Sequence, residues 1–195
     1  MKAIPGLLTL SLLCCSFHGG AQVKNEREYR IDSVEFPNKA IRLMTDYLDT
    51  ARRIRYFKEY DGARIHYEIK LILNRKKYSV EFDSIGNLMD VETYIENGDI
   101  PSEARQNIET YLKSEYTRYR IVKVQRQYPK SSYRQDDTLL ENAFKGVIDS
   151  TINYEMVIAG RKKKGFEDYE ISFDGTGQIV SNRNFISIGY DHILY

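Results

Sequence analysis

The chain has 195 residues, of which 29 are Lys or Arg and 28 are Asp or Glu, so its formal net charge at pH 7 is only +1. Proteins that bind nucleic acid usually carry a clear excess of positive charge, so this balance argues against a nucleic-acid partner. The only two cysteines lie near the N-terminus, which excludes a disulfide framework or a thiolate metal site in the rest of the chain.

The N-terminus has the three-part layout of a secretory signal peptide. Lys2 supplies a positive charge, residues 4–17 are almost wholly apolar, and small side chains follow at 19–21. The apolar run is shorter than the roughly 20 residues that cross a bilayer. We therefore expect residues 1–21 to be removed by cleavage near Ala21. No later stretch reaches transmembrane length.

A lipoprotein is the alternative, because Cys14 and Cys15 close the apolar run. The residues before them, Leu12 and Leu13, are not the small residue that lipoprotein processing requires, so we favour simple cleavage. Cleavage removes Lys2 and both cysteines, which leaves 28 basic and 28 acidic residues. A domain of roughly 170 residues that folds without disulfides is typical of the bacterial periplasm. We expect a periplasmic or secreted protein.

Residues 22–35 are expected to form an N-terminal extension, and a helix is predicted directly after it. Pro37 forces Phe36 into an extended conformation, and Asn38 can cap the first turn. Apolar side chains then recur at helical spacing, at Ile41, Met44, Leu48 and Ala51.

Beyond this helix the period changes to 2, which predicts strands covered on one face only. Residues 64–73 and 77–82 alternate in this way, and Asp83 to Gly86 has the composition of a hairpin turn. The predicted inward side chains are Ile65, Tyr67, Ile69, Leu71 and Leu73. The predicted outward side chains include Arg64, His66, Glu68 and Lys70, which we expect to be solvated.

Three motifs occur in the same order in both halves of the chain, which indicates an internal duplication. The matched segments are 36–40 with 100–104, 67–69 with 154–156, and 82–86 with 173–177. The predicted fold class is therefore α+β, with two tandem repeats, each a helix packed on an antiparallel sheet. We place the repeats at 36–99 and 100–195. Residues 129–150 form a polar insertion in the second repeat, which has one or two helical turns near 136–144.

These motifs resemble those of the PepSY-like group of periplasmic proteins, which is related in fold to the beta-lactamase inhibitory proteins. The resemblance covers nearly all of residues 36–188. It rests on (Ile/Phe)-Pro-x-x-Ala at the helix start, Tyr-Glu-hydrophobic in a strand, and Phe-Asp-x-x-Gly in a turn. It implies tandem helix-plus-sheet units whose open sheet face is suited to proteins or peptides. The insertion at 129–150 departs from the family pattern.

The leading functional hypothesis is a binding or inhibitory module that contacts a protein, peptide or cell-envelope component through the open sheet face. The 16 tyrosines, with no tryptophan, are suited to wide contact surfaces. The candidate contact residues are Arg64, His66, Glu68, Lys70, Tyr133, Glu155 and Glu170. The alternative is a carrier that holds a small amphipathic ligand between helices and sheet.

An enzyme is not expected. After cleavage the chain keeps only His66 and His192, has no cysteine, and lacks a Gly-x-Ser-x-Gly elbow, a His-Glu-x-x-His pair or a Gly-rich phosphate loop. We accordingly predict no catalytic residues, no cofactor and no metal ligands.

Overall fold

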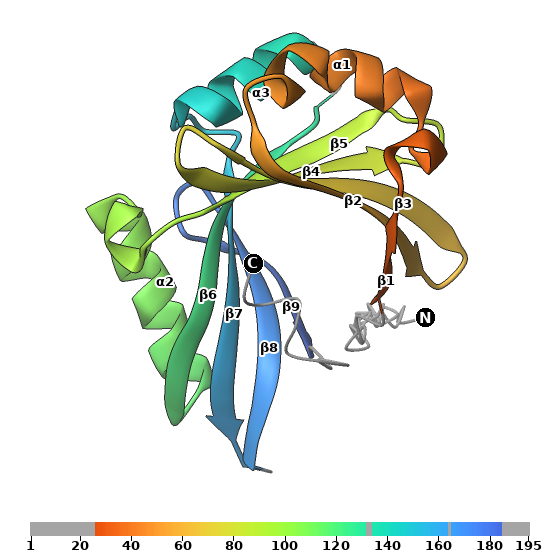
Figure 1. Cartoon of the computed structure of the whole chain (residues 1–195). Coiled ribbons are helices and arrows are strands. Elements are labelled where there is room, and N and C mark those ends of the chain that lie inside the picture. The colour runs from red at the N-terminus through yellow and green to blue at the C-terminus, as the bar shows by residue number, and fades with distance from the viewer. Residues whose placement is uncertain (1–25, 132–133, 164, 185–195) are drawn as a thin grey trace, which may run out of the picture.

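A computed structural model describes residues 26–131, 134–163 and 165–184 (Figure 1). The predicted signal peptide, with Cys14 and Cys15, lies outside these ranges, as does Tyr133. Within them, no helix has both the length and the apolar character needed to cross a membrane.

The described chain forms one antiparallel sheet of nine strands and three α-helices, with each strand paired to its neighbours in sequence. The predicted α+β class is confirmed. In chain order the elements are β1 (Glu26–Ile31), the 3-10 turn η1 (Ser33–Glu35), α1 (Asn38–Leu48), β2 (Arg52–Asp61), β3 (Arg64–Leu73), β4 (Lys76–Asp83), β5 (Leu88–Tyr94), η2 (Asn97–Asp99), α2 (Ser102–Glu115), β6 (Arg118–Pro129), α3 (Asp136–Lys145), β7 (Asn153–Lys162), β8 (Gly165–Asp174) and β9 (Ile179–Asn184).

The sheet is strongly curved, and the helices lie on its outer face. Figure 1 shows α1 and α3 over β2 to β5, and α2 beside β6 to β9. Apolar side chains of alternate strand positions point toward these helices, and many are fully buried. They include Ile69, Val80, Phe82, Val91, Tyr128, Tyr154, Met156, Ile171 and Phe173. Among the described residues, no helix lies on the inner face.

The two repeats correspond residue by residue at the helix starts. Both helices begin directly after the predicted prolines, Pro37 and Pro101. The side chains that anchor each helix are buried at matched positions, namely Phe36 and Ile100, Ala40 and Ala104, and Met44 and Ile108. The tandem repeat therefore exists in three dimensions as well as in the sequence.

The two Phe-Asp turns are also equivalent, and each one supports its helix. Asp83 accepts a hydrogen bond from the Asn87 amide at 2.8 Å, and Asp174 accepts one from the Gln178 amide at 3.0 Å. Gly86 and Gly177 both have φ +83°, which a residue with a Cβ rarely adopts. A Cβ at Gly177 would lie 2.2 Å from the Ala104 carbonyl oxygen.

The same close approach occurs in the first repeat, because a Cβ at Gly86 would lie 2.9 Å from the Pro37 Cβ. In both repeats the first turn of the helix rests directly on the turn glycine. The glycine is required by its backbone angle and by the helix above it.

The predicted insertion is more structured than expected. Instead of one or two turns in a polar loop, α3 is a ten-residue helix that buries Leu139, Leu140 and Ala143 completely. The ring centroid of Phe144 lies 4.6 Å from Tyr47 of α1 and 4.9 Å from Tyr78 of β4. A helix inserted in the second repeat thus completes the core of the first.

Replacing the turn glycines is expected to destabilise the fold. We predict that Gly177→Ala lowers the free energy of unfolding by about 3 kcal/mol and Gly86→Ala by about 2 kcal/mol, through a strained φ and a clash with the helix start. Urea denaturation measures both. Gly98 is the matched control, since a Cβ there meets nothing within 4 Å. Equal midpoints for Gly177→Ala and Gly98→Ala would contradict the argument.

Candidate functional site

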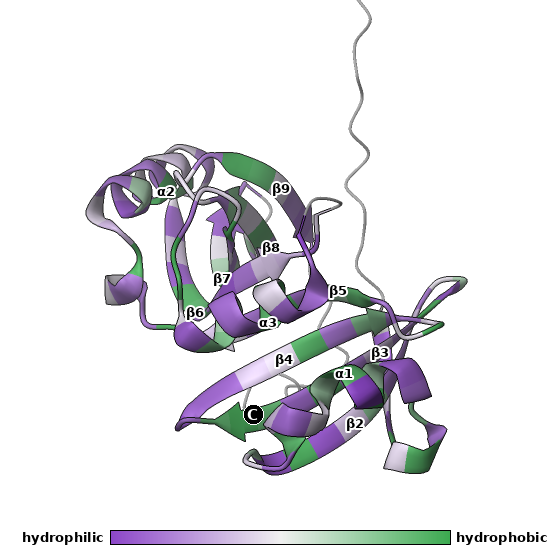
Figure 2. Cartoon of the chain, turned by 90° about the horizontal axis from the view of Figure 1, so that it is seen from above, coloured by the Kyte–Doolittle hydropathy of each residue, from purple (hydrophilic) through white to green (hydrophobic). Residues whose placement is uncertain are grey.

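The inner, helix-free face of the sheet, called the polar face below, collects the polar positions of all nine strands. Figure 2 shows hydrophilic and hydrophobic residues alternating along β4. The register of the strands places the polar residues side by side on this face. Its members include Glu28, Arg55, Glu59, Arg64, His66, Glu68, Lys70, Ser79, Glu81, Asp90, Glu92, Gln125, Gln127, Asn153, Glu155, Glu170 and Arg183.

Six of the seven predicted contact residues lie on the polar face, in two separate groups. Arg64, His66, Glu68 and Lys70 project from β3, and Glu155 and Glu170 from β7 and β8. Strands β4, β5 and β6 separate the groups. The seventh residue, Tyr133, lies outside the described residues.

The predicted solvation of this face is wrong for its central carboxylates. Glu68, Glu155 and Glu170 retain only 5%, 7% and 3% of their accessible surface. Ion pairs along the face account for part of this burial, because the Arg183 Nη2 lies 2.6 Å from the Glu170 Oε1. The polar face is a packed layer of hydrogen-bonded charges.

Lys70 is the cation at the centre of the first group. Its Nζ lies 2.8 Å from Glu28 Oε1 and 3.0 Å from Glu68 Oε2, and 4.6 Å from the centre of the Phe57 ring. Ser79 Oγ also donates a hydrogen bond to Glu68. Burial favours the neutral amine, but the charges of Glu68 and Glu28 outweigh it and raise the pKa of Lys70.

The same contacts keep Glu68 ionised. Burial would raise the pKa of this carboxyl, yet the charge of Lys70 and the hydrogen bonds to Glu68 hold its pKa below the ordinary value. Glu28, Glu59 and Glu68 each place one carboxylate oxygen within 4.8 Å of the others, a spacing that could hold a metal ion. The Lys70 amine contacts two of the three, and we assign it as the counter-ion of this cluster.

A second cluster of acids continues the row across β4 and β5. Glu81 stands directly opposite Glu68 on one side and Asp90 on the other. Repulsion from Asp90, together with burial and the charges of Glu92, Glu59 and Glu68, raises the pKa of Glu81 well above its ordinary value. Gln127 Nε2 donates to Asp90 at 3.1 Å and to Glu92 at 3.3 Å.

Glu81, Asp90 and Glu92 were not among the predicted site residues. The alternation of Glu81 with Val80 and Phe82 placed it on the open face, but the sequence analysis assigned no strand to the segment of Asp90 and Glu92, and nothing in it showed that β4 and β5 bring these acids against Glu68. The available signal was the recurrence of acidic residues at every second position of both segments.

Removing the Lys70 amine is expected to destabilise the fold, because it leaves two carboxylates buried without their cation. We predict that Lys70→Met lowers the free energy of unfolding by about 3 kcal/mol at pH 7. Lys58→Met is the matched control, since Lys58 is on the neighbouring strand and points to the opposite face, over the Tyr60 ring. Chemical denaturation of both variants measures the change in the free energy of unfolding. A loss in Lys70→Met no larger than that in Lys58→Met would disprove the role of Lys70 as the counter-ion.

Replacing Glu81 is expected to have the opposite effect. A carboxyl with a raised pKa in the folded protein favours folding as the pH falls toward its ordinary value of 4.5 and disfavours it when ionised. Glu81→Gln should therefore be more stable than the wild type at pH 7.5, by about 1 kcal/mol. This advantage should shrink as the pH falls toward 4.5.

Urea denaturation at several pH values tests this dependence. Glu141→Gln is the control, because the Lys145 amine lowers the pKa of the Glu141 carboxyl and the sign is reversed. A Glu81→Gln variant that is less stable than the wild type at pH 7.5 would show that ionised Glu81 is well compensated.

The fold resembles that of several solved bacterial proteins. A BLIP-like protein from Bacteroides fragilis aligns with a TM-score of 0.50 at 14% identity, over 80% of this chain and 91% of that one. A protein of Bacteroides eggerthii named as periplasmic gives 0.53 at 14% identity, over 80% and 94%. A DUF2874 family protein from Bacteroides uniformis gives 0.52 at 15% identity, over 76% and 89%.

At these identities the likeness establishes the fold, and the predicted relationship to the beta-lactamase inhibitory proteins is confirmed at that level. None of the three names describes an enzyme. No family model matches the sequence, and no curated protein matches it.

Proposed function

We propose that this chain, which has the BLIP-like fold, is a periplasmic binding module whose polar face contacts a protein or peptide that carries basic groups. The observation behind this proposal is the row of acids Glu68, Glu81 and Asp90, which face one another across β3, β4 and β5. Like charges directly opposite in a sheet are destabilising. Natural sequences keep such local conflicts mainly at functional sites.

The chemistry of the row indicates the partner. Lysine or arginine side chains from a partner would neutralise Glu81, Asp90 and Glu92 more fully than Gln127 does, since an amide carries no net charge. Complementary charge of this kind gives specificity and fast association. Arg64, which is exposed, and His66, which is partly buried, lie on the same face and would meet the partner beside the acidic row.

The export route and the domain limits belong to the same proposal. The signal-like segment 1–21, cleaved near Ala21, would deliver the protein to the periplasm, where the structural relative from Bacteroides eggerthii is also placed by its name. Anchoring through Cys14 or Cys15 stays the less favoured route. We keep the extension at 22–35, the repeats at 36–99 and 100–195, and the assignment as a non-enzyme without a cofactor.

The alternative, a carrier of an amphipathic ligand between helices and sheet, receives no support from the core. The facing side chains of α1 and of the sheet beneath it are fully buried, including Ala40, Met44, Ile69 and Val80. Because these inward side chains are closely packed, we assign them to stabilising the fold and not to binding a ligand.

Site-directed photo-crosslinking in exporting bacterial cells tests the proposal. A benzoylphenylalanine at His66 or Ser172 would report on the polar face, and one at Arg42, exposed on α1, would report on the helix face. We expect a defined adduct from the two polar-face positions and none from Arg42. The adduct should weaken when Glu59 is replaced by Lys, because the reversed charge repels a basic partner.

Adducts formed equally from all three positions, or from Arg42 alone, would refute the assignment of the face. An adduct that persists unchanged in Glu59→Lys would refute the basic character of the partner while leaving the face in place.

A further inference from the structure

The N-terminal half of β6 is paired on one side only, although β6 lies in the middle of the strand order. On one side β6 pairs with β7 from Arg118 onward, but on the other side β5 reaches it only from Gln125 to Pro129. The amide of Ile95, the residue after β5, donates a hydrogen bond to the Val124 carbonyl at 3.1 Å. Within the described chain, residues 118–121 therefore have no paired strand on the β5 side, whereas the Lys123 Nζ already lies 5.6 Å from the centre of the Tyr94 ring of β5. We call residues 118–121 the free edge.

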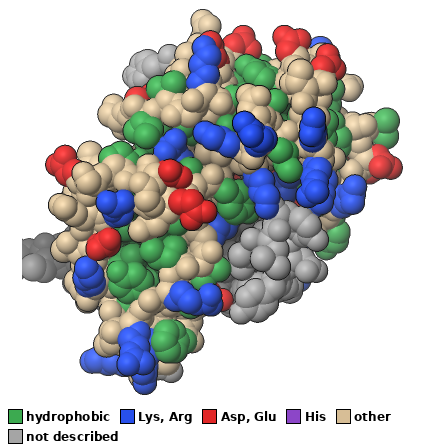
Figure 3. Space-filling view, turned by 60° about the vertical axis from the view of Figure 1, so that its left-hand side comes forward, with side chains coloured by type: hydrophobic (Ala, Val, Ile, Leu, Met, Phe, Trp, Pro, Cys, Tyr) green, Lys and Arg blue, Asp and Glu red, His purple; other side chains and the backbone are tan. Residues whose placement is uncertain are grey.

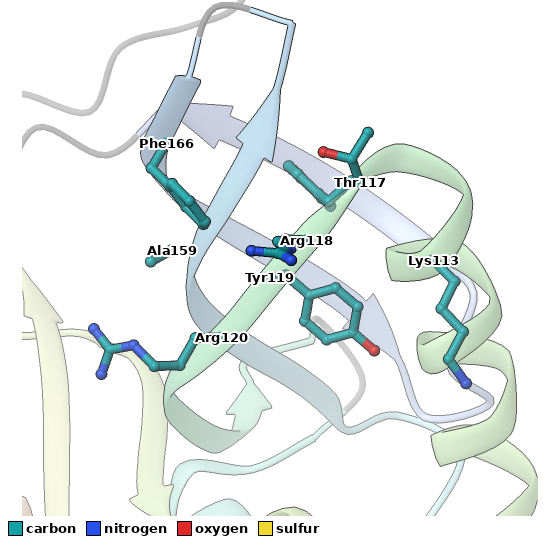
Figure 4. Close-up of a pocket in the computed structure, with 8 residues that line it drawn as sticks. Lys113, Thr117, Arg118, Tyr119, Arg120, Ala159 and Phe166 are labelled. Carbon is teal, nitrogen blue, oxygen red and sulfur yellow. The ribbon is translucent and has the colours of Figure 1, made fainter.

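A surface pocket of about 650 Å³ wraps around the free edge (Figure 4). Figure 4 shows Arg118, Ala159 and Phe166 on one side of β6, and Tyr119 and Lys113 on the side of α2. The residues that line it are Lys113, Tyr116, Thr117, Arg118, Tyr119, Arg120, Ala159 and Phe166. Its volume is in the range of ligand pockets.

The charge of the pocket is positive. Three of its eight lining residues are Lys or Arg, and none is acidic. Lys113 pairs with Glu109 on its own helix at 3.2 Å, but neither Arg118 nor Arg120 pairs with a carboxylate among the described residues. Figure 3 shows Lys and Arg side chains spread over this side of the molecule, including its lower end. This charge is opposite to that of the acidic row on the polar face.

The floor of the pocket is rigid. Tyr116 is only 3% exposed, and its hydroxyl accepts a hydrogen bond from Asn182 Nδ2 at 2.9 Å. Its ring packs so closely on Gly160 that a Cβ there would lie 2.5 Å from the ring. Phe166, by contrast, is 59% exposed at the rim, with Arg161 over its ring. A preformed floor of this kind reduces the entropy lost on binding, and the exposed Phe166 ring offers apolar surface that a ligand can cover.

We propose that the free edge binds an extended acidic peptide segment by strand addition. The peptide would pair its backbone with the groups of residues 118–121 that face away from β7, a stretch of about 13 Å. Because side chains alternate along a strand, acidic residues two positions apart would face Arg118 and Arg120. The residues between them would lie against Tyr119 on the side of α2.

Charged side chains and bulges normally protect a sheet edge from association, and β6 has a register shift between Ile121 and Lys123. At the free edge, the charged side chains determine which partner can bind. Arg118 and Arg120 repel a basic or identical strand, whereas they attract an acidic one. Arg118 and Arg120 project on the same side of the sheet as the polar face, because they stand opposite Arg161 and Ala159. The acidic row of Glu68, Glu81 and Asp90 lies on other strands, β3 to β5, so either proposal can fail alone.

Fluorescence anisotropy with a labelled peptide, Ac-Glu-Val-Glu-Tyr-Glu-Val-Glu-NH2, tests strand addition on the full exported chain. Two comparison peptides isolate the causes: one replaces each Glu by Lys, and one is N-methylated at alternate backbone positions, which keeps the charge but removes hydrogen-bond donors. We expect both to bind at least about tenfold more weakly, equivalent to about 1.4 kcal/mol.

The protein variants provide the second arm. Arg118→Glu with Arg120→Glu should weaken binding of the glutamate peptide by at least about tenfold, whereas Arg42→Glu, exposed on α1, should not. Hydrogen exchange should slow at residues 118–121 when the peptide binds. Equal binding of the N-methylated peptide, equal binding by the doubly reversed variant, or unchanged exchange at the free edge would each overturn the proposal.

Discussion

The pairing of β5 with β6 joins the two repeats, and the other features of the molecule depend on it. Five residue pairs, from Asp90 with Pro129 to Tyr94 with Gln125, turn two small sheets into one of nine strands. Without this pairing each repeat would present an unpaired strand to solvent, which invites association with other chains. The pairing also sets which polar side chains become neighbours, because it brings Gln127 beside Glu92.

The joint is reinforced from the helix side. The helix α3, inserted between β6 and β7 of the second repeat, lies over the first repeat and packs Phe144 against Tyr47 and Tyr78. The two halves therefore share side chains as well as strands. Each repeat nevertheless has its own turn glycine, Gly86 or Gly177, against which the first turn of its helix packs. The duplication preserved this contact in both repeats.

Two surfaces of opposite charge result from the same construction. Helices on one face only leave the polar side chains of nine strands to satisfy one another, and in the first repeat this concentrates acids around Lys70. In the second repeat, β6 extends beyond the end of β5, so its first residues pair with β7 alone. This leaves a basic edge beside α2. A binding module with both surfaces could contact a basic partner on the sheet and an acidic segment on the edge.

The sequence alone determined the fold class, the duplication and the facing of the residues in β3, β4, β7 and β8, because these depend on local periodicity and on special residues such as Pro37, Pro101, Gly86 and Gly177. It also placed Glu68, Glu155 and Glu170 on the helix-free face. Only the tertiary structure decided that these carboxylates are buried, that Glu81 lies between Glu68 and Asp90, and that α3 covers the other repeat. The physical reason is that alternation shows which face a side chain occupies, whereas its neighbours on that face depend on strand order and register, which arise from contacts far apart in the chain.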